Sequence, residues 1–376
     1  MKTHQFQVHL GIIGILVCSG TIWAQSSLGF TTLRQFGMGG TGIAQTFDSA
    51  ALYTNPAGLS KAKSEVRLPL TFRMDMNDSV LNNLSVFSDI AAEDSMSARI
   101  DILNSANLIP STLAIKGALS PAFSISNSNF AFAILGATNI YSKFSNPVSP
   151  VISISGFTDL SPMIGVSDTY SVFGQKVSVG ASLMAVYRTR IVEPSTGAFT
   201  VVRYYSDMIN EDDNVTPISQ TTMSGFGGNV GALVPFGNGH IGAVIYNLGT
   251  PLTGTTASGN SVSETLPVFL GMGIAQTIDA GIVPLVGSLI GDFSAAADVR
   301  LQYPDMYKNI FLGVEKSVLG GAIKLRAGLY QGYPTVGVGV DTFLCHAQYA
   351  FYTEELGAHV GDNPVSYQGV ELGFLF

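Results

Sequence analysis

Few residues of this chain have the types and the spacing that enzyme chemistry requires. The three histidines beyond residue 24 are scattered, without the spacing of a metal-binding HExxH motif. His346, on the last expected strand but one, is the single candidate for a hydrolytic histidine. The glycine-rich run 37–42 is not a GxGxxG fingerprint after a strand, and no Gly-Lys-Ser/Thr follows to make it a P-loop. The sequence therefore predicts no catalytic residues, no cofactor and no enzyme.

A metal site has one candidate, an acidic loop. Glu211, Asp212, Asp213 and Asn214 gather the oxygen ligands that calcium prefers. A solvated loop explains the same residues without a ligand, so we predict no metal. Basic residues form no cluster, and the chain beyond residue 24 has a formal charge of 17 minus 26, or −9, because Lys2 is left out. Nucleic acid is therefore not an expected partner.

The composition is that of a membrane protein rather than a soluble one. Only 12% of residues are charged and 46% are hydrophobic, against roughly 25% charged in ordinary soluble domains. A membrane-spanning helix needs about 20 apolar residues, and the one candidate, 266–290, contains Asp279 and Pro284. We therefore expect a strand at 268–275 followed by an apolar loop. In that loop, 281–290 could form a lip where a lipid docks or extend a buried hairpin, and the sequence favours neither.

The first 24 residues predict a secretory signal peptide. Lys2 precedes the apolar run 10–23, and Ala24 is a small residue in front of the polar stretch 25–27. A run of about 14 apolar residues is short for a retained membrane anchor. Val17 before Cys18 does not fit a lipidation motif. Cleavage after residue 24 leaves Cys345 as the single cysteine, so an internal disulfide is excluded.

Period-two alternation is the strongest secondary-structure signal. Each alternating segment has one apolar face and one polar or small face, as a strand does. A soluble barrel turns the apolar face inward, whereas a membrane barrel turns it towards lipid. The low charge, the 42 glycines and the signal peptide favour the membrane barrel. The sequence predicts an all-β fold, a transmembrane antiparallel β-barrel of about 14 strands over 63–376. The clearest segments are 65–76, 293–302, 323–330 and 336–341, and weaker ones lie near 111–118, 129–137, 150–157, 176–187, 199–205, 223–234, 240–247, 309–316 and 346–353.

The last segment of the chain has a second signal. Val370, Leu372, Phe374 and Phe376 alternate with small or polar residues, apart from Leu375, and the final residue is aromatic. This pattern resembles the C-terminal signal of bacterial outer-membrane barrels, which the barrel-assembly machinery recognises. The resemblance implies the outer membrane as the location, with outer-membrane lipid and that machinery as partners.

Residues 25–62 do not alternate and contain two motifs. Gly37, Gly39 and Gly40 crowd together, and glycine allows close packing or positive φ. Asn55-Pro56-Ala57 combines a residue without an N–H with an asparagine that can satisfy the neighbouring backbone. A turn before the first strand would explain Asn55-Pro56 alone. The whole order, with Asp48-Ser49-Ala50-Ala51 between the two motifs, resembles the N-terminal hatch of the FadL-type long-chain fatty acid transporters. The resemblance implies a hatch over 25–62 that contains Gly37, Gly39, Gly40, Asp48, Asn55, Pro56 and Ala57.

The same resemblance implies a function. FadL-type barrels carry hydrophobic small molecules such as long-chain fatty acids passively across the outer membrane, and we expect an apolar pocket gated by the hatch. One branch of the family resembles scaffolds of the type IX secretion system, which bind secreted proteins, and this alternative stays open. An apolar pocket that reaches the hatch would favour transport, and a polar or blocked lumen would favour the scaffold. A general porin ranks last, because it needs a constriction lined by charges of both signs and this chain has few charges.

Overall fold

The structure of the chain is a computed structural model. Several expectations lie outside the residues that it describes, namely the signal peptide, the acidic loop 211–214, the apolar stretch 281–290 and the terminal Phe376. The described residues are 30–67, 72–93, 95–106, 108–109, 111–146, 148–193, 195–204, 218–278, 293–342 and 345–374.

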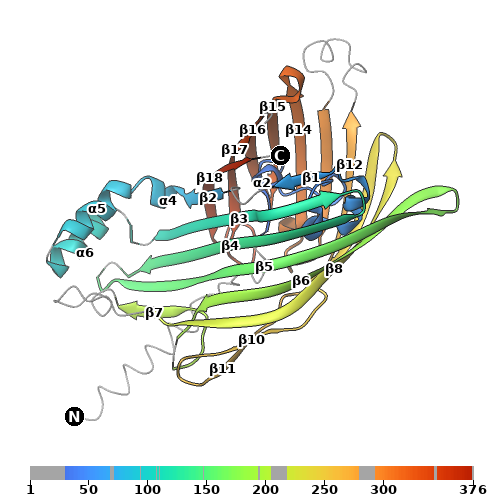
Figure 1. Cartoon of the computed structure of the whole chain (residues 1–376). Helices are drawn as coiled ribbons and strands as arrows, with labels where there is room; N and C mark the ends of the chain where they lie inside the picture. The colour runs from blue at the N-terminus through green and yellow to red at the C-terminus, as the bar shows by residue number, and fades with distance from the viewer. Residues whose placement is uncertain are drawn as a thin grey trace.

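Within these residues, fourteen strand positions close into one antiparallel barrel (Figure 1). β1 (Glu65–Arg67) and β2 (Phe72–Asn77) both pair with β3 and share the first position. The last strand pairs with β2, so the cylinder has no free edge. The predicted barrel of about 14 strands is confirmed. The other positions are β3 (Ser111–Asn127), β4 (Phe130–Ser145), β5 (Val151–Val172), β6 (Gln175–Ile191), β8 (Gln220–Phe236), β9 (Gly239–Tyr246), β12 (Phe269–Ile278), β13 (Phe293–Arg300), β14 (Ile310–Val318), β15 (Ile323–Tyr330), β16 (Tyr333–Asp341), β17 (Cys345–Glu355) and β18 (Pro364–Phe374).

The barrel has its apolar face outside, as β16 illustrates. Val336, Val338 and Val340 are exposed by 52%, 42% and 40%, whereas the intervening Thr335 and Gly337 are buried. A soluble barrel would bury the valines and expose the others. The alternation read from the sequence is therefore confirmed in its membrane sense, with lipid as the outer solvent and small or polar residues inside. The chain is an outer-membrane β-barrel in architecture.

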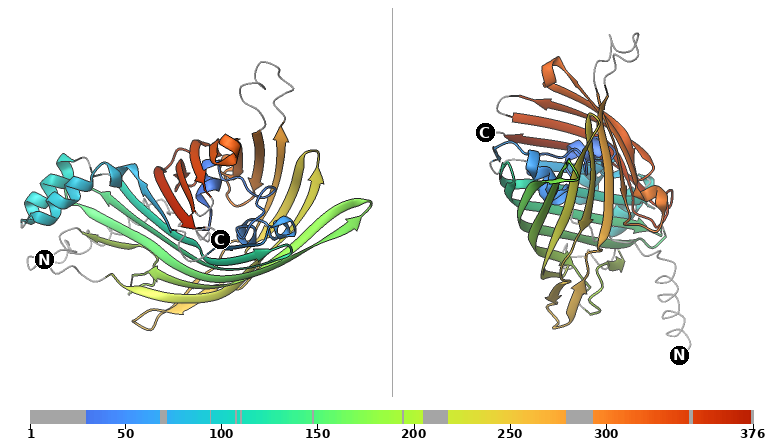
Figure 2. Two further views of the ribbon diagram at one scale, coloured as in Figure 1. Left: turned by 45° about the horizontal axis from the view of Figure 1, so that its top comes forward. Right: turned by 90° about the vertical axis from the view of Figure 1, so that its right-hand side faces the viewer.

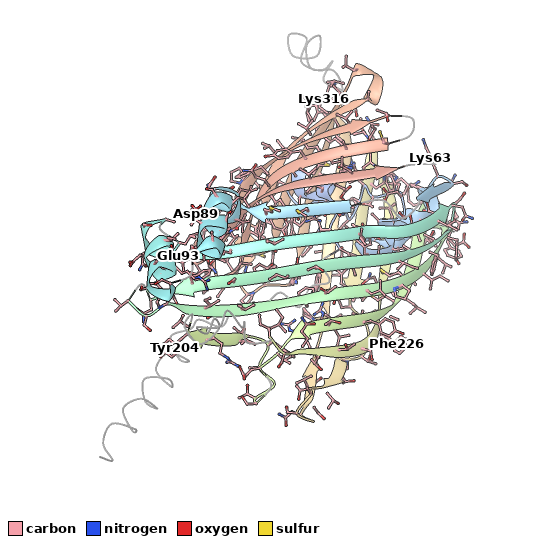
Figure 3. The ribbon with its side chains drawn as sticks, turned by 60° about the vertical axis from the view of Figure 1, so that its left-hand side comes forward. Lys63, Asp89, Glu93, Tyr204, Phe226 and Lys316 are labelled. Atoms are coloured by element: carbon pink, nitrogen blue, oxygen red, sulfur yellow. The ribbon has the colours of Figure 1, made fainter. Side chains whose placement is uncertain are left out.

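The two ends of the barrel differ in their connections. Tight turns join β3 to β4, β5 to β6 and β8 to β9 at one end, which we call the turn end. The opposite end, the loop end, has mostly longer connections and corresponds to the cell exterior in bacterial barrels. Figure 3 shows Asp89 and Glu93 near the loop end, Lys63 and Lys316 towards the turn end, and Phe226 on the outer surface. β3 to β6 and β8 have 16 to 22 residues, more than the roughly 10 that cross a bilayer, so they extend beyond it (Figure 2).

The loop end contains elements that the alternation did not predict. A helical projection follows β2, and its apolar side chains pack with Phe144 and Ile152 of the barrel wall. The predicted strand 199–205 is a four-residue strand that pairs with β5 outside the ring of fourteen, which corrects its expected place in the wall. Among the described residues, no helix has the length and apolar character to cross a membrane. The loop-end elements outside the ring of fourteen are α4 (Asp78–Leu81), α5 (Leu84–Ala92), α6 (Met96–Ser105), β7 (Val201–Tyr204), β10 (Leu252–Thr255), β11 (Ser261–Glu264) and η3 (Met306–Asn309). The short helix η4 (Leu319–Gly321) lies at the turn end.

The N-terminal segment, which we define as residues 30–62, folds into three short helices. α2 (Leu33–Gly37) begins with a capping box in which Thr32 and Gln35 bond each other's backbone N–H groups. α3 (Ala51–Thr54) and η1 (Pro56–Lys61) follow. α2 lies against β15 to β18, and η1 lies against β4, β5, β6 and β8. Figure 2 shows this segment within the curve of the sheet.

Candidate functional site in the barrel lumen

The glycines of the N-terminal segment lie where its backbone touches the strands most closely. A Cβ on Gly39, which has φ +62°, would be 2.1 Å from the carbonyl oxygen of Leu312. A Cβ on Gly37 would be 3.1 Å from the Cα atom of Gly337. Glycines on the strands match them, and a Cβ on Gly180 would be 2.5 Å from the Ala57 nitrogen. The crowded glycines therefore let two backbones meet without side chains between them.

Asn55 connects the segment to itself and to the wall. Its side chain is fully buried, and its Nδ2 donates to the carbonyl oxygens of Ile43 at 2.9 Å and Ala232 of β8 at 3.2 Å. Its Oδ1 accepts the Ala57 N–H at 3.2 Å. Pro56 has no N–H to satisfy. Before α3, the Asp48 carboxylate accepts the Ala50 N–H at 2.9 Å and so caps the turn that leads into this helix. One asparagine thus satisfies three backbone groups away from water.

Charged side chains of the C-terminal strands hold the first part of the segment. Arg34 and Arg326 both donate to Glu315, with nitrogen–oxygen distances of 3.0 and 2.7 Å. The Asp298 carboxylate accepts the backbone N–H groups of Gly42 at 2.8 Å and Ile43 at 3.1 Å. These contacts are charge-assisted, and they lie between the segment and strands β13 to β15.

The closing seam of the barrel also meets the segment. Arg73 of β2 pairs with Asp75 and donates to the carbonyl oxygen of Thr31. Glu371 of β18 accepts the Leu33 N–H at 3.3 Å. The first and last positions of the barrel are therefore joined through residues 31–33 as well as through their own ladder.

A second charged cluster closes the loop end. Arg188 binds Asp159 with two hydrogen bonds of 2.7 Å and lies 3.0 Å from Glu264, which also pairs with Arg190 at 2.7 Å. The Arg188 guanidinium lies 4.0 Å from the ring centre of Phe157. Because Glu264 belongs to β11, this cluster anchors the β10–β11 hairpin to β5 and β6. Several charged residues of both signs thus lie inside the barrel, where they are buried in ion pairs, which the sequence did not reveal.

A cavity of about 100 Å³ lies between the N-terminal segment and the loop end. β9, β13 and β15 end at this cavity, and β12 and β14 begin there. Tyr246 and Phe269 stack with ring centres 4.5 Å apart, and the Tyr246 hydroxyl donates to the carbonyl oxygen of Thr54 at 2.6 Å. The rings come from five helices and strands and two connecting segments far apart in sequence, so the pattern of single strands could not predict the cavity. Seven aromatic residues line it: Phe30, Tyr53, Tyr246, Phe269, Tyr303, Phe311 and Tyr330.

Polar groups share the lining of this cavity. Arg300 is the one charged residue among the described residues that line it. The others are amides and hydroxyls, so the cavity is less apolar than the sequence analysis expected. It nevertheless reaches the N-terminal segment, as expected of a transport pocket. These residues are Thr31, Gln35, Thr54, Asn229, Asn247, Gln302 and Gln331.

The remaining residues singled out in the sequence lie elsewhere. His346 is on β17, the last strand but one, where it is buried with its Nε2 atom 3.4 Å from Glu371. Val370 and Leu372 face outward and are 48% and 52% exposed. Among the described residues, no group of His, Cys, Asp and Glu could hold a metal ion.

Comparisons with known proteins give one fold. No family model matches the chain, and no curated protein matches it. Among solved structures it is similar to a deltaS2S3 mutant of TodX, a monoaromatic hydrocarbon channel, with a TM-score of 0.50 and 14% identity over 92% of this chain and 98% of that chain. The two chains share one fold. At this identity the similarity extends to the fold alone.

Two toluene transporters also resemble the chain. The Pseudomonas putida TodX structure has a TM-score of 0.44 and 12% identity over 93% of this chain and 98% of that chain. Ralstonia pickettii TbuX has a TM-score of 0.43 and 13% identity, also over 93% and 98%. The fold shared with the TodX mutant channel confirms the FadL-type resemblance at the level of the fold.

Proposed function

We propose that this chain is an outer-membrane channel for the passive uptake of compact hydrophobic molecules, with residues 25–62 as its hatch. The cavity between the N-terminal segment and the loop end carries the proposal. It lies inside a barrel whose outer face suits lipid, and seven aromatic rings line it. Small-molecule sites combine such rings with polar groups that orient the ligand, and eight of the fifteen lining residues here are polar or charged.

The size of the cavity bears on the cargo. An apolar cavity of about 150 Å³ holds benzene in another protein, so about 100 Å³ is on the scale of a single ring or a short chain. A long-chain fatty acid would need additional space, for example by movement of the N-terminal segment. We therefore favour single-ring compounds over the fatty acids expected from the sequence. The proposal agrees with the hydrocarbons for which TodX and TbuX are named.

The hatch role belongs to the same proposal. Gly37, Gly39 and Gly40 allow the segment to lie against β14 to β16, and Asn55 holds its second half to β8. Displacement of this segment would open the path from the cavity to the turn end. The assembly role of Val370, Leu372, Phe374 and Phe376 likewise stays a proposal, supported by the outward faces of Val370 and Leu372.

The test fills the cavity and compares a matched control. Gln302→Trp places a large ring in the cavity, whereas Leu301→Trp places the same ring at the adjacent position, whose side chain is 48% exposed. Outer membranes that contain each variant are assayed for the uptake rate of radiolabelled toluene. We expect Gln302→Trp to abolish the uptake that the wild type adds and Leu301→Trp to preserve it. Equal uptake with and without the wild-type protein would refute the proposal.

A secretion scaffold remains the second candidate, for one reason. α5 and α6 project from the loop end, where a secreted protein could bind (Figure 1). Mass spectrometry of the detergent-purified protein separates the two functions. Stoichiometric small hydrophobic molecules that disappear in Gln302→Trp support transport, and an empty cavity with a co-purifying secreted protein supports the scaffold.

A further inference from the structure

We infer that the cavity selects a single-ring aromatic molecule that carries an uncharged oxygen substituent, such as a phenol or an aryl ketone, over the bare hydrocarbon. This inference deepens the proposed function and rests on it. It assigns Arg300 and Gln302 as specificity-determining residues. The observations that carry it are the polar groups among the rings and the position of the one lining charge.

Arg300 brings hydrogen-bond donors to the wall of the cavity. Its guanidinium lies 4.5 Å from the ring centre of Phe311, which also lines the cavity. One terminal nitrogen donates to the carbonyl oxygen of Gly40 and lies 3.6 Å from Asp298, the Nε atom is fully buried, and the other terminal nitrogen has no acceptor among the described residues. Arginine has five N–H donors and no acceptor. A ligand that uses the spare donors must therefore supply an acceptor, such as an oxygen atom.

Gln302 adds a second polar group to the same wall. Its backbone N–H donates to Asn309 Oδ1 at 3.1 Å, and its side-chain amide has no partner among the described residues. A bare hydrocarbon would displace water from this amide without replacing its hydrogen bonds. Burying an unsatisfied polar group costs free energy, and sites built to bind a polar substituent reject analogues that lack it. An oxygen substituent removes this cost.

The charge around the cavity argues against a carboxylate. Asp298 lies 3.6 Å from the Arg300 guanidinium, so the two side chains together have no net charge. Asp298 also accepts two backbone N–H groups of the N-terminal segment, which fixes it beside Arg300. A carboxylate in the cavity would gain one positive neighbour and one negative neighbour. A neutral oxygen gains the donor without meeting the same repulsion.

The experiment compares three probes on the full-length protein in detergent: toluene, p-cresol and benzoate. Equilibrium binding is measured for the wild type, Arg300→Gln and Gln302→Leu, and each affinity is corrected for partition into micelles. Arg203→Gln removes a cation at the loop end, away from the cavity, and serves as the control. Gln302→Leu leaves the contact between Arg300 and the N-terminal segment intact, so it tests the inference even if Arg300→Gln disturbs folding.

We expect each cavity variant to lower the ratio of p-cresol affinity to toluene affinity by about tenfold, the effect of one lost hydrogen bond to a charged or buried group. We expect the control to leave the ratio unchanged. An unchanged ratio in both cavity variants, or tighter binding of benzoate than of p-cresol, would overturn the inference. If toluene still bound, the proposed channel function would stand. Absence of binding by all three probes would instead contradict the proposed function.

Discussion

The two halves of the N-terminal segment differ in their charged contacts with the barrel. Residues 31–43 meet β13 to β18 and β2 through charged side chains, with Glu315 and Asp298 at the centre, in addition to the packing of Leu33 and Phe36. Residues 44–61 meet β4 to β9 through apolar packing around Leu52 and Leu59 and through neutral hydrogen bonds, such as that from Ser182 to the Leu52 carbonyl oxygen at 2.7 Å. Both halves touch strands of the same barrel.

The difference teaches how each half could move. Each carboxylate here accepts two charge-assisted hydrogen bonds, so removing one carboxylate removes both of its bonds at once. Apolar packing is lost in proportion to the volume removed. The first half therefore resembles a latch, whereas the second half resembles a packed core. If the segment opens as the proposed hatch, these two parts would be released under different conditions.

The largest effect is expected from Glu315→Gln. It removes the carboxylate from Arg326, whose side chain is 1% exposed, and breaking such a buried pair costs about 3–5 kcal/mol, whereas Arg34, at 29% exposure, adds little. The midpoint of guanidinium unfolding, followed by circular dichroism in detergent, should fall accordingly. Asp341→Asn is the control on the adjoining strand β16, because its pair with Lys324 is 29% exposed and should contribute less than about 1 kcal/mol. Equal losses in both variants would contradict the latch.

Leu52→Ala tests the packed half. Leu52 is fully buried among Met163, Met184 and Leu59, so its truncation should cost about 2–5 kcal/mol. The same unfolding measurement applies. Leu183→Ala, on the lipid-facing side of β6 with 69% exposure, is the matched control and should change the midpoint much less. If the control lost as much stability, the second half would not be a core.

Asn55→Ala should have a smaller effect. It removes the partners of the Ile43 and Ala232 carbonyl oxygens and of the Ala57 N–H, at a cost of about 1–3 kcal/mol. We expect faster proteolysis of residues 44–62 with the barrel intact by heat-modified gel mobility. Asp48→Ala, which removes one turn hydrogen bond, should have a weaker effect. Unchanged proteolysis in Asn55→Ala would show that packing alone holds this half.

The smallest effect lies outside the lumen and depends on pH. The hydrogen bond from Arg203 lowers the pKa of Glu193 in the loop after β6. The pair therefore stabilises this loop above the ordinary glutamate pKa of about 4.3, and the contribution is lost as the pH falls through the lowered pKa. The protection of residues 195–204 against hydrogen exchange, expressed as a free energy, should fall at acid pH by less than about 1 kcal/mol. Glu193→Gln should remove the pH dependence, and 1 M salt should weaken it, unlike the buried latch.

Much of the barrel could be predicted from the sequence, because alternation fixes which face of a strand meets lipid. The valines of β16 and the pair Val370 and Leu372 are examples. The helical projection α5–α6 and the hairpin β10–β11 gave no comparable signal. Helices do not alternate with period two, and four-residue strands are too short to show the alternation. The hatch motif came from a resemblance rather than from periodicity.

The candidate site was far less predictable. Arg300, Phe269 and Tyr330 are separated by many residues in sequence, and only closure of the cylinder brings them around one cavity. The low number of charges also gave no indication that several of them form buried ion pairs inside the barrel. Burial of Arg188 and Glu264 in pairs depends on three strands meeting, which no local pattern records.

The seam between β2 and β18 has a consequence for biogenesis. Arg73 and Glu371 lie on the first and last strand positions, whose pairing closes the barrel. Both side chains also bind residues 31–33. A chain whose N-terminal residues lay outside would close its cylinder without these bonds. Closure of the wall and enclosure of the N-terminal segment therefore depend on the same pair of strands. A barrel that contains the segment has more bonds across its closing seam than an empty one.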